Sequence, residues 1–301
     1  PPQAAPSFEN IKVPLSDGDT LIVAVSTPAE WKDANRSIVL VHGMCGSATS
    51  SYMVRMATRF THHGVRVIRA NLRGCGAGQG HASKPYHSGI SDDIRRVLLF
   101  LAEKTRSPTT VIGFSLGGNI VLKLAGEDGA TPTGMMDSVI GVSAPIDLER
   151  SSQMLSRPHN RVYERYFVKE LFELALSRHR GDASQKGRLA KLSRTMTLRQ
   201  FDDAYTAPLS GFRDAEDYYD RCSAQHFIQG IRLPRFILTS ADDPMVAHEP
   251  YLKINQAREV HVQVTAHGGH LGFLEYRGLC PERWMDYRIE QWLRTHGMLG
   301  T

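Results

Sequence analysis

The sequence predicts an α/β fold with a mostly parallel sheet, helices on both faces of that sheet, and an inserted helical cap. Three observations support this prediction. Short apolar runs recur along the chain, and most of them lack the strict alternation of a half-exposed strand. Segments with helical spacing lie between these runs. The stretch of residues 146–227 has helical, charged sequence and no convincing strand.

The strand signals begin with a hairpin. Ile11 to Val25 turns at Ser16–Asp19, and apolar residues alternate along its second arm. Continuous apolar runs follow, each bounded by turn residues, as a sheet covered on both faces requires. We expect these strands at Ser37–His42, Val65–Ala70, Thr109–Phe114, Ser138–Ser143, Arg235–Thr239 and Glu259–Thr265.

Helix candidates lie between the strands. In Ser91–Lys104, Ser91 is the expected N-cap, and two following aspartates complement the positive end of the helix dipole. A second helix is expected over Leu116–Ala125. The last one is expected over Pro281–His296, with the proline in its first turn.

The chain has 301 residues, long for one compact unit and short for two, so we predict one domain with an insertion. Residues 1–145 and 228–301 would form the core, and residues 146–227 the cap. Within the cap, Arg178–Arg199 carries seven basic residues against one acidic residue. A solvated helix face is the simpler interpretation, and contact with a membrane surface, a lipid or another anionic ligand is the alternative.

The composition is that of a globular protein, with 41% apolar and 22% charged residues, which excludes fibrous and disordered classes. The net charge of +5 is too mild to indicate nucleic-acid binding. Four cysteines without a C-x-x-C pair indicate neither a zinc site nor a disulfide framework. No apolar run reaches the ~18 residues that a membrane span needs. Because Pro1–Ser7 shows no signal peptide, we expect a cytoplasmic protein, although the chain does not begin with Met.

A nucleophile motif stands at Gly113-Phe114-Ser115-Leu116-Gly117. It matches G-x-S-x-G and lies between an apolar strand and a helix, which is the context that the motif requires. A serine on such a sharp turn exposes its Oγ above the sheet. Glycines are needed on both sides because Cβ atoms there would clash with the neighbouring strand and helix. We therefore predict Ser115 as a nucleophile.

A serine nucleophile needs a base, and the base needs an orienting carboxylate. Candidates follow two late strands in the chain order serine, acid, histidine. His270 is the expected base, with His267 as its competitor. Asp243 is preferred as the acid over Asp242, because it directly precedes the Pro-Met-Val run that usually follows the acid in this architecture.

The loop Val41–Ser47 follows an early strand, and its glycines allow backbone N–H groups to approach a substrate closely. We assign the oxyanion donors to the backbone amides of Met44 and Leu116. Cys45 in this loop could suggest a cysteine nucleophile. No histidine or acid is placed in the sequence to serve it, so we expect a small loop residue there.

Two further patterns do not support a cofactor or a metal. Gly74–Gly80 is rich in glycine after a strand, but its spacing departs from a dinucleotide-binding loop, and Pro85 discourages the helix that would cradle a pyrophosphate. His267 and His270 lie near two aspartates, but no H-E-x-x-H pattern accompanies them. We expect neither a cofactor nor a metal.

The segments HGMCGS, GFSLGGN, DDP and HGGHLGF stand in an order that resembles the α/β-hydrolase-4 family, the YheT-like hydrolases and their eukaryotic α/β-hydrolase-domain relatives. Further matching segments are Arg69-x-Asn71-x-Arg73-Gly74-Cys75-Gly76, Tyr86-His87-Ser88-Gly89, Phe201-Asp202-Asp203 with Thr206-Ala207, and Asp214-Ala215-x-Asp217-Tyr218-Tyr219 leading to Cys222-Ser223-Ala224. The match runs from about residue 10 to 296. Members usually carry an upstream segment, and the eukaryotic ones a membrane anchor, neither of which is visible here.

This resemblance implies an α/β-hydrolase fold and serine hydrolysis of carboxylic esters, with short- to medium-chain acyl groups and no cofactor. It also implies that Ser115, Asp243 and His270 form a catalytic triad. We expect a lipase-like carboxylesterase that acts on small-molecule acyl esters through an acyl-enzyme, with no nucleic-acid partner. The alternatives are an acyltransferase that moves the acyl group to an alcohol, a non-catalytic binding protein, and a nucleic-acid or membrane binder that uses the basic stretch. The sequence leaves the acyl length, the alcohol portion and the oligomeric state open.

The predicted cap interrupts the sheet after the strand that follows the nucleophile strand. Ligands of open parallel sheets bind outside the carboxyl ends of the strands, so an insertion there should roof the pocket. Tyr163, Phe167 and Leu171 are the expected substrate-binding residues, from an apolar set that also includes Phe172, Leu174 and Leu176. The alternative is that these side chains only pack the cap onto the core.

Overall fold

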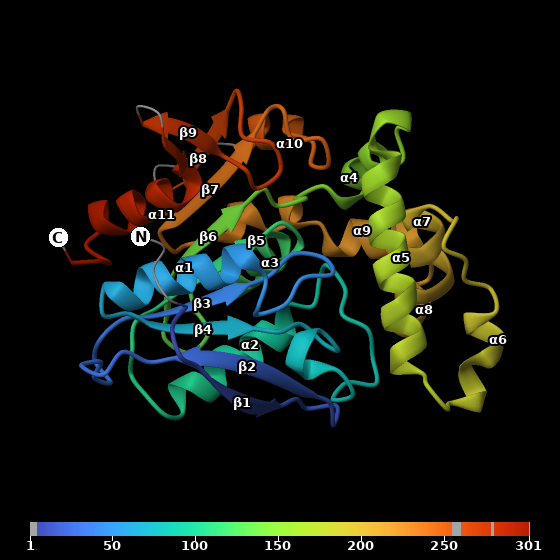
Figure 1. Ribbon diagram of the computed structural model, residues 1–301, viewed down its shortest axis with the longest axis horizontal. Helices are drawn as coiled ribbons and strands as arrows, with labels where there is room; N and C mark the ends of the chain where they lie inside the picture. Colours follow the sequence, from blue (N-terminus) through green and yellow to red (C-terminus); the bar gives the residue numbers. More distant parts are fainter. Residues whose placement is uncertain (1–4, 255–259, 278–279, 301) are drawn as a thin grey trace.

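The computed structural model describes residues 5–254, 260–277 and 280–300. Its main sheet has the order β1-β2-β4-β3-β5-β6-β7-β8 (Figure 1). β1 and β2 form an antiparallel hairpin, β2 is also antiparallel to β4, and the other neighbouring pairs are parallel. The prediction of a mostly parallel sheet is therefore confirmed. The strands are β1 (Glu9–Pro14), β2 (Thr20–Ser26), β3 (Ser37–Val41), β4 (Arg66–Ala70), β5 (Thr109–Phe114), β6 (Met136–Val142), β7 (Arg235–Ser240) and β8 (Val260–Thr265).

The predicted parallel strands all form, with ends that agree to within one or two residues. The predicted start of the last one, Glu259, lies outside the described residues. Every side chain of β3, β4 and β5 is buried. Burial on both faces explains why these runs lack the alternation of apolar and polar residues that a half-exposed strand shows.

Helices cover both faces of the sheet (Figure 1). Alternate side chains of one strand point to opposite faces, so β3 contributes to two cores. Leu40 packs in the core under α1 and α11, whereas Val39 packs in the core under α2 and α3. This layering is the predicted one. The four helices are α1 (Ser51–His62), α2 (Ser91–Ala102), α3 (Leu116–Asp128) and α11 (Trp284–Thr295).

Two predicted helix starts are wrong. Ser91 is the first helical residue rather than the N-cap, and its hydroxyl donates to Glu127 of α3 instead of capping. Pro281 does not open the last helix, because it lies in β10 (Cys280–Arg283), which pairs with β9 (Leu274–Arg277). For Ser91 the contact with α3 overrides the local signal, and for Pro281 the pairing with the neighbouring strand β9 does so.

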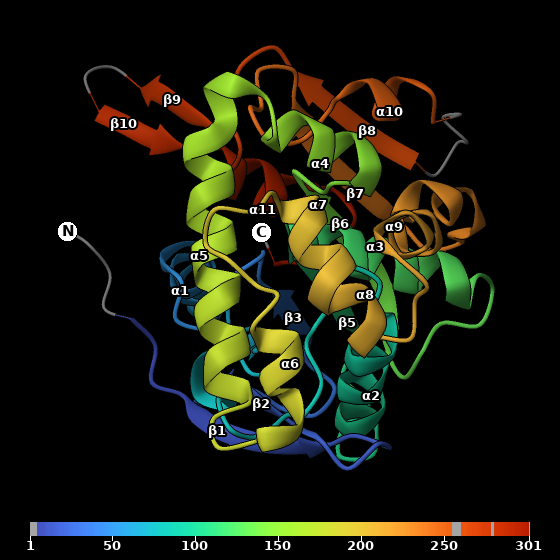
Figure 2. The same cartoon turned by 90° about the vertical axis from the view of Figure 1, so that its right-hand side faces the viewer.

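Residues 146–227, called the inter-strand segment below, connect β6 to β7 and contain helices as their only regular elements. They gather at one end of the sheet (Figure 1, right), and Figure 2 faces them. Among the described residues, no helix combines the length and apolar character that crossing a membrane requires. The segment comprises α4 (Leu148–Leu155), α5 (Arg161–Arg178), α6 (Lys186–Leu189), α7 (Leu198–Phe201), a π-helical turn (Asp202–Thr206), α8 (Ala207–Leu209), α9 (Ala215–Cys222) and 3-10 turns at Pro158–Asn160, Ala183–Gln185 and Ala224–His226. Outside it lie α10 (Glu249–Leu252) and 3-10 turns at Gly76–Gly78 and Ile228–Gly230.

The basic stretch Arg178–Arg199 is partly neutralised within the chain. Arg194 and Arg199 form ion pairs with glutamates of α5 and α4. Arg178 donates a hydrogen bond to the hydroxyl of Tyr205. These contacts favour a structural role for part of the stretch, and its contact with a membrane or another anionic ligand stays a prediction.

Buried Arg73 joins three parts of the core. Its guanidinium donates to both carboxylate oxygens of Asp93 in α2, at 2.7 Å each, and to Asp17 and Asp19 in the hairpin turn, also at 2.7 Å each. Asp19 and Asp93 are buried as well. A buried carboxylate needs such a partner, because removing a charge from water is costly.

The substitution Arg73→Met should lower the free energy of unfolding by about 3–5 kcal/mol, because it leaves two buried carboxylates without a cation. Urea unfolding would measure this loss. Lys84→Met is the matched control: Lys84 also binds Asp17, but its side chain is 56% exposed, so it should cost less than about 1 kcal/mol. Equal losses in the two variants would contradict this account of Arg73.

Candidate active site

Ser115 occupies the turn that joins β5 to α3. Its φ of 53° lies in the left-handed region, which residues other than glycine seldom adopt. A Cβ atom on Gly113 would lie 2.2 Å from the carbonyl oxygen of Gly117, and one on Gly117 would lie 2.4 Å from that of Val41. Strand and helix therefore approach each other so closely that both positions require glycine, as the motif predicts.

Asp243 follows β7 and His270 follows β8, so both reach the carboxyl edge of the sheet where Ser115 lies. The Nε2 atom of His270 is 2.8 Å from Ser115 Oγ, and its Nδ1 atom is 2.9 Å from Asp243 Oδ2. The other oxygen of Asp243 accepts hydrogen bonds from the amides of Met245 and Val246, at 2.8 and 3.0 Å. With Nδ1–H donating to the carboxylate, Nε2 is left to accept the serine proton.

The competing acid and base lie elsewhere. Asp242 accepts a hydrogen bond from the amide of Gly269 at 2.9 Å, and it lies 3.4 Å from the Nδ1 atom of His267. The His267 side chain is 90% exposed. Asp242 therefore stabilises the loop that carries His270, whereas Asp243 is the aspartate that contacts the His270 ring.

The loop after β3 is held by a buried histidine. His42 Nδ1 lies 2.7 Å from the carbonyl oxygen of Gly43, and its Nε2 accepts a hydrogen bond from the amide of Leu72 at 3.1 Å. Complete burial lowers the pKa of His42 to about 4, so the ring is neutral at pH 7. One ring nitrogen can then donate while the other accepts, which fixes both the ring and the loop.

The two expected oxyanion donors remain available. The amides on either side of Met44 are engaged, because Gly43 donates to the hydroxyl of Tyr52 at 2.9 Å and Cys45 to that of Tyr86 at 3.0 Å. Neither the Met44 amide nor that of Leu116 donates to a described residue. Free N–H groups beside a nucleophile could bind a developing oxyanion, so the assignment of these two amides stays a supported prediction.

Cys45 lacks the features of a reactive thiol. Burial raises the pKa of its thiol to about 12, so the group is protonated at pH 7. Its thiol lies against the backbone carbonyl of Phe167 and the hydroxyl of Tyr86. The residue therefore packs the loop against α5.

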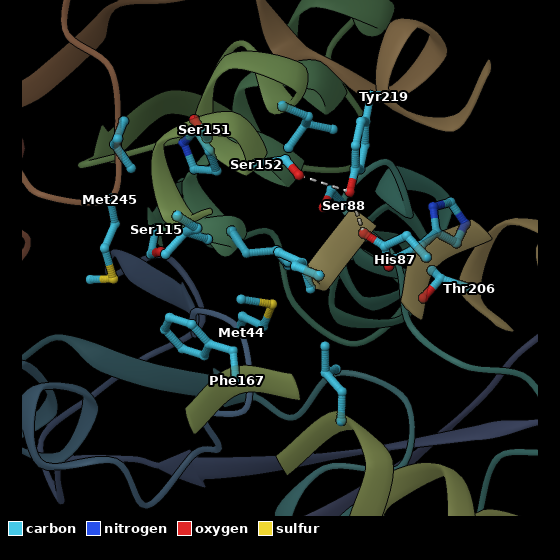
Figure 3. A pocket seen from close by; sticks show the side chains of 18 of the residues that line it. Met44, His87, Ser88, Ser115, Ser151, Ser152, Phe167, Thr206, Tyr219 and Met245 are labelled. Atoms are coloured by element: carbon cyan, nitrogen blue, oxygen red, sulfur yellow. Dashed lines mark hydrogen bonds between the residues drawn. The ribbon is translucent and has the colours of Figure 1, made fainter. Parts of the chain in front are cut away.

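A pocket lies over Ser115 and His270, between the sheet and the inter-strand segment (Figure 3). Its walls are mainly apolar. Side chains from both parts of the chain contribute to them, among them Met44, Leu148, Leu155, Leu198 and Met245. The pocket can therefore hold an apolar group next to the serine hydroxyl.

Two of the three expected substrate-binding residues line this pocket. Phe167 and Leu171 face it from α5. Tyr163 does not line it, and its side chain is 41% exposed. It lies one helical turn before Phe167, where α5 extends beyond the pocket, so we exclude it from the candidate site. Leu176 is also exposed.

The sequence reasoning missed a polar end of the pocket. Figure 3 shows Ser88, Tyr219 and Thr206 across the pocket from Ser115, and Asp202 lines the pocket as well. In the sequence, these residues stand out only as members of segments that carry the family resemblance. Because they belong to separate elements, no spacing in the sequence indicates that their side chains meet.

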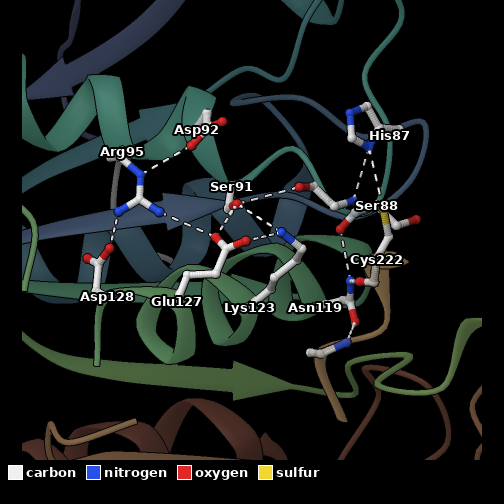
Figure 4. A network of polar contacts seen from close by, with 12 residues as sticks. His87, Ser88, Ser91, Asp92, Arg95, Asn119, Lys123, Glu127, Asp128 and Cys222 are labelled. Atoms are coloured by element: carbon white, nitrogen blue, oxygen red, sulfur yellow. Dashed lines mark hydrogen bonds and ion pairs between the residues drawn. The ribbon is translucent and has the colours of Figure 1, made fainter. Parts of the chain in front are cut away.

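Asn119 in the first turn of α3 fixes one side of this polar end (Figure 4). Its amide nitrogen donates to the carbonyl oxygens of Ser88 and Cys222, and its oxygen accepts from the amide of Ala224, all at 2.8 Å. The helix that follows Ser115 is thereby bonded to the pocket residue Ser88 and to the chain just after α9.

Comparison with known proteins shows relatives along nearly the whole chain. The family model described as alpha/beta hydrolase fold matches residues 36–276. The Escherichia coli (strain K12) protein named "Putative esterase YheT" is 34% identical over 97% of this chain and 85% of that protein. The Saccharomyces cerevisiae protein named "Monoacylglycerol lipase" is 30% identical over 84% of this chain and 57% of that protein.

Among solved structures, the Pyrococcus furiosus esterase Pf2001 aligns with a TM-score of 0.61 at 14% identity, over 98% of this chain and 96% of that chain. At that identity the likeness concerns the fold alone. The similar proteins carry esterase and lipase names, which supports ester hydrolysis as the reaction class. The predicted resemblance is confirmed by the family match and by the similarity to YheT: the chain belongs to the alpha/beta hydrolase fold family.

Proposed function

We propose that the protein is a serine hydrolase of carboxylic esters, with Ser115 as nucleophile, His270 as general base and Asp243 as the orienting acid. The observation that carries this proposal is the continuous hydrogen-bonded chain from Ser115 Oγ through the imidazole to Asp243, at 2.8 and 2.9 Å. It faces an apolar pocket. The esterase and lipase names of similar proteins support the same reaction class.

In the proposed mechanism, His270 Nε2 takes the hydroxyl proton as Ser115 Oγ attacks the ester carbonyl. Asp243 stabilises the imidazolium and holds its tautomer. The amides of Met44 and Leu116 bind the oxyanion of the tetrahedral intermediate. The alcohol leaves with the proton from His270, and an acyl-enzyme remains. Water, deprotonated by His270, then releases the carboxylic acid and regenerates the serine hydroxyl.

For the substrate, we propose small-molecule esters with short- to medium-chain acyl groups. The inter-strand segment would act as a cap over a core made of residues 1–145 and 228–301. Phe167 and Leu171 contribute apolar surface from this segment, and Met44 contributes it from the core. Burying acyl methylene groups between these surfaces supplies the binding energy.

Ser115→Ala should lower turnover of a 4-nitrophenyl ester by about 10⁴- to 10⁶-fold, because it removes the nucleophile. Labelling by a fluorophosphonate probe should disappear as well. Alanine is no larger than serine, so the midpoint of thermal unfolding should stay close to that of the parent protein. A loss of turnover below tenfold, with unchanged unfolding, would show that another residue is the nucleophile.

Asp243→Asn should lower turnover by up to ~10⁴-fold, because the imidazolium loses its anionic partner and the other tautomer becomes accessible. Asp242→Asn is the matched control, since its side chain bonds the His270 loop without touching the His270 ring. We expect it to cost less than about tenfold. Greater damage from Asp242→Asn in the same kinetic assay would assign the acid role to Asp242.

Along a series of acyl esters, kcat/KM should rise with chain length until the pocket is filled, by up to ~0.8 kcal/mol for each buried methylene. Leu171→Trp should move the optimum to shorter chains, because it fills pocket volume. Leu176→Trp changes an exposed residue of the same helix and should leave the optimum in place. Equal activity from acetate to decanoate esters would contradict acyl binding in this pocket.

A further inference from the structure

The proposed mechanism leaves one buried carboxylate unexplained. Asp202 lies in the π-helical turn of the inter-strand segment, is 6% exposed and lines the pocket. The hydroxyl of Tyr219 donates to its Oδ2 atom at 2.7 Å. Among the described residues, no cation forms an ion pair with it. Such π turns are frequent at functional sites.

Other buried aspartates of the chain have the partners that Asp202 lacks. Asp93 is paired with Arg73, Asp286 with Arg55, and Asp243 with two backbone amides and His270. Burial raises the pKa of Asp202 to about 6, although the hydroxyls of Thr206 and Tyr219 oppose this shift. A further hydrogen-bond donor would stabilise the ionised form of this carboxylate.

The side chains around Asp202 are mostly hydroxyls that are themselves held in place. Tyr218 donates to Ser88 Oγ at 2.7 Å and accepts from the Ser88 amide at 2.8 Å. The Ser88 carbonyl is bonded to Asn119 (Figure 4). Tyr219 also lies 3.4 Å from Ser152 Oγ. This end of the pocket is thus a fixed polar surface rather than a set of mobile groups.

Its position relative to Ser115 defines the shape of a suitable ligand. In Figure 3, Ser115 and Met245 lie on one side of the pocket, Ser88 and Tyr219 lie on the other, and Met44 lies between them. A molecule that reaches both ends has its ester group at the serine and an apolar middle. Its far end must carry a group that donates a hydrogen bond to Asp202.

The hydroxyls that surround Asp202 at this end of the pocket favour a neutral donor. Burial and the positive charges of Lys123, Arg73 and Arg221 lower the pKa of His87, which lines the same end, to about 3. All three cations are paired with carboxylates within the chain, so they do not by themselves exclude a cationic ligand. An ammonium group, however, cannot accept from the neighbouring hydroxyls, and Asp202 repels a carboxylate. A hydroxyl carries no charge, donates to the carboxylate and accepts from neighbouring hydroxyls.

We propose that the polar end of the pocket binds a hydroxyl group on the far arm of the ester, with Asp202 as its acceptor, so that hydroxylated esters are the preferred substrates. This inference rests on the proposed ester hydrolysis. The hydroxyl belongs either to the acyl arm or to the alcohol arm, and matched substrates separate the two.

The test compares esters that differ only at the end of one arm. For the acyl arm, 4-nitrophenyl ω-hydroxyalkanoates are compared with alkanoates that carry methyl in place of hydroxyl, and with the ω-ammonium analogues. For the alcohol arm, hexanoate monoesters of linear diols are compared with hexanoates of alkanols. Over arms of four to ten carbons, kcat/KM should favour the hydroxyl over the methyl by about tenfold at one length.

Asp202→Asn should reduce this preference about five- to tenfold, because an amide oxygen is a weaker acceptor than a carboxylate. Asp203→Asn is the matched control. Asp203 is exposed and accepts from the amide of Ala215, and it does not line the pocket, so the preference should be unchanged. If Asp202→Asn does not fold, inhibition of the parent enzyme can be measured instead. Linear diols should then inhibit more strongly than alkanols of equal length.

The outcomes separate this inference from the proposed function. Hydrolysis of the methyl series without a hydroxyl preference at any length would overturn the inference and leave ester hydrolysis standing. A preference for the ammonium analogues would also overturn it, in favour of a cation site. Absence of hydrolysis with every ester would contradict the proposed function itself.

Discussion

β5 and α3 approach each other closely at the turn that carries Ser115, and this contact determines where the other parts of the site lie. Ser115 adopts a left-handed backbone conformation there, and the packing of its neighbours excludes side chains at Gly113 and Gly117. The loop after β3 comes equally near, since a Cβ atom on Gly43 would lie 3.0 Å from Ser115 Cβ. Because β5 lies in the middle of a parallel sheet, loops from β3, β7 and β8 end beside the same hydroxyl.

The inter-strand segment is bonded to this centre on two sides. Asn119 connects α3 to the end of the segment, through Cys222 and Ala224. On the other side, Asn160 donates to the carbonyl of Pro244, the residue after Asp243, at 2.6 Å. The pocket walls are therefore held in register with the reacting groups by buried amide contacts, which resist sliding better than apolar packing alone.

The sequence predicts the parts of this molecule that depend on local rules. Buried strands are recognisable because burial on both faces demands continuous apolar runs. The order of Ser115, Asp243 and His270 follows from the order of strands in the sheet. The prediction fails for Pro281, because pairing with the neighbouring strand β9 outweighs the preference of proline for the first turn of a helix. For Tyr163, helical spacing predicts that it shares a face of α5 with Phe167 and Leu171. The spacing does not indicate at which residue of that face the pocket ends.

Asp202 lay beyond prediction for a related reason. Its environment is built from the loop before α2, the π-helical turn and α9, which meet only in the folded chain. Neither Ser88 nor Tyr219 carries a functional signal in the sequence by itself. They form a polar site only because the fold brings their hydroxyls together. The triad can be predicted from sequence order because the strand order of the sheet places its three loops side by side. No comparable rule predicts which residues form the far wall of a pocket.

Asp202 and Asp243 show how the surroundings of one residue type decide what it can do. The carboxylate of Asp243 accepts from two backbone amides and faces an imidazole, so its acceptor sites are occupied and its orientation is fixed. Asp202 faces hydroxyls, and no cation among the described residues forms an ion pair with it. A donor that arrives with the substrate would therefore find an acceptor in Asp202 that the described part of the chain itself pairs with hydroxyls only. Such binding at the far end would position the ester carbonyl at Ser115 without making contact with the reacting atoms.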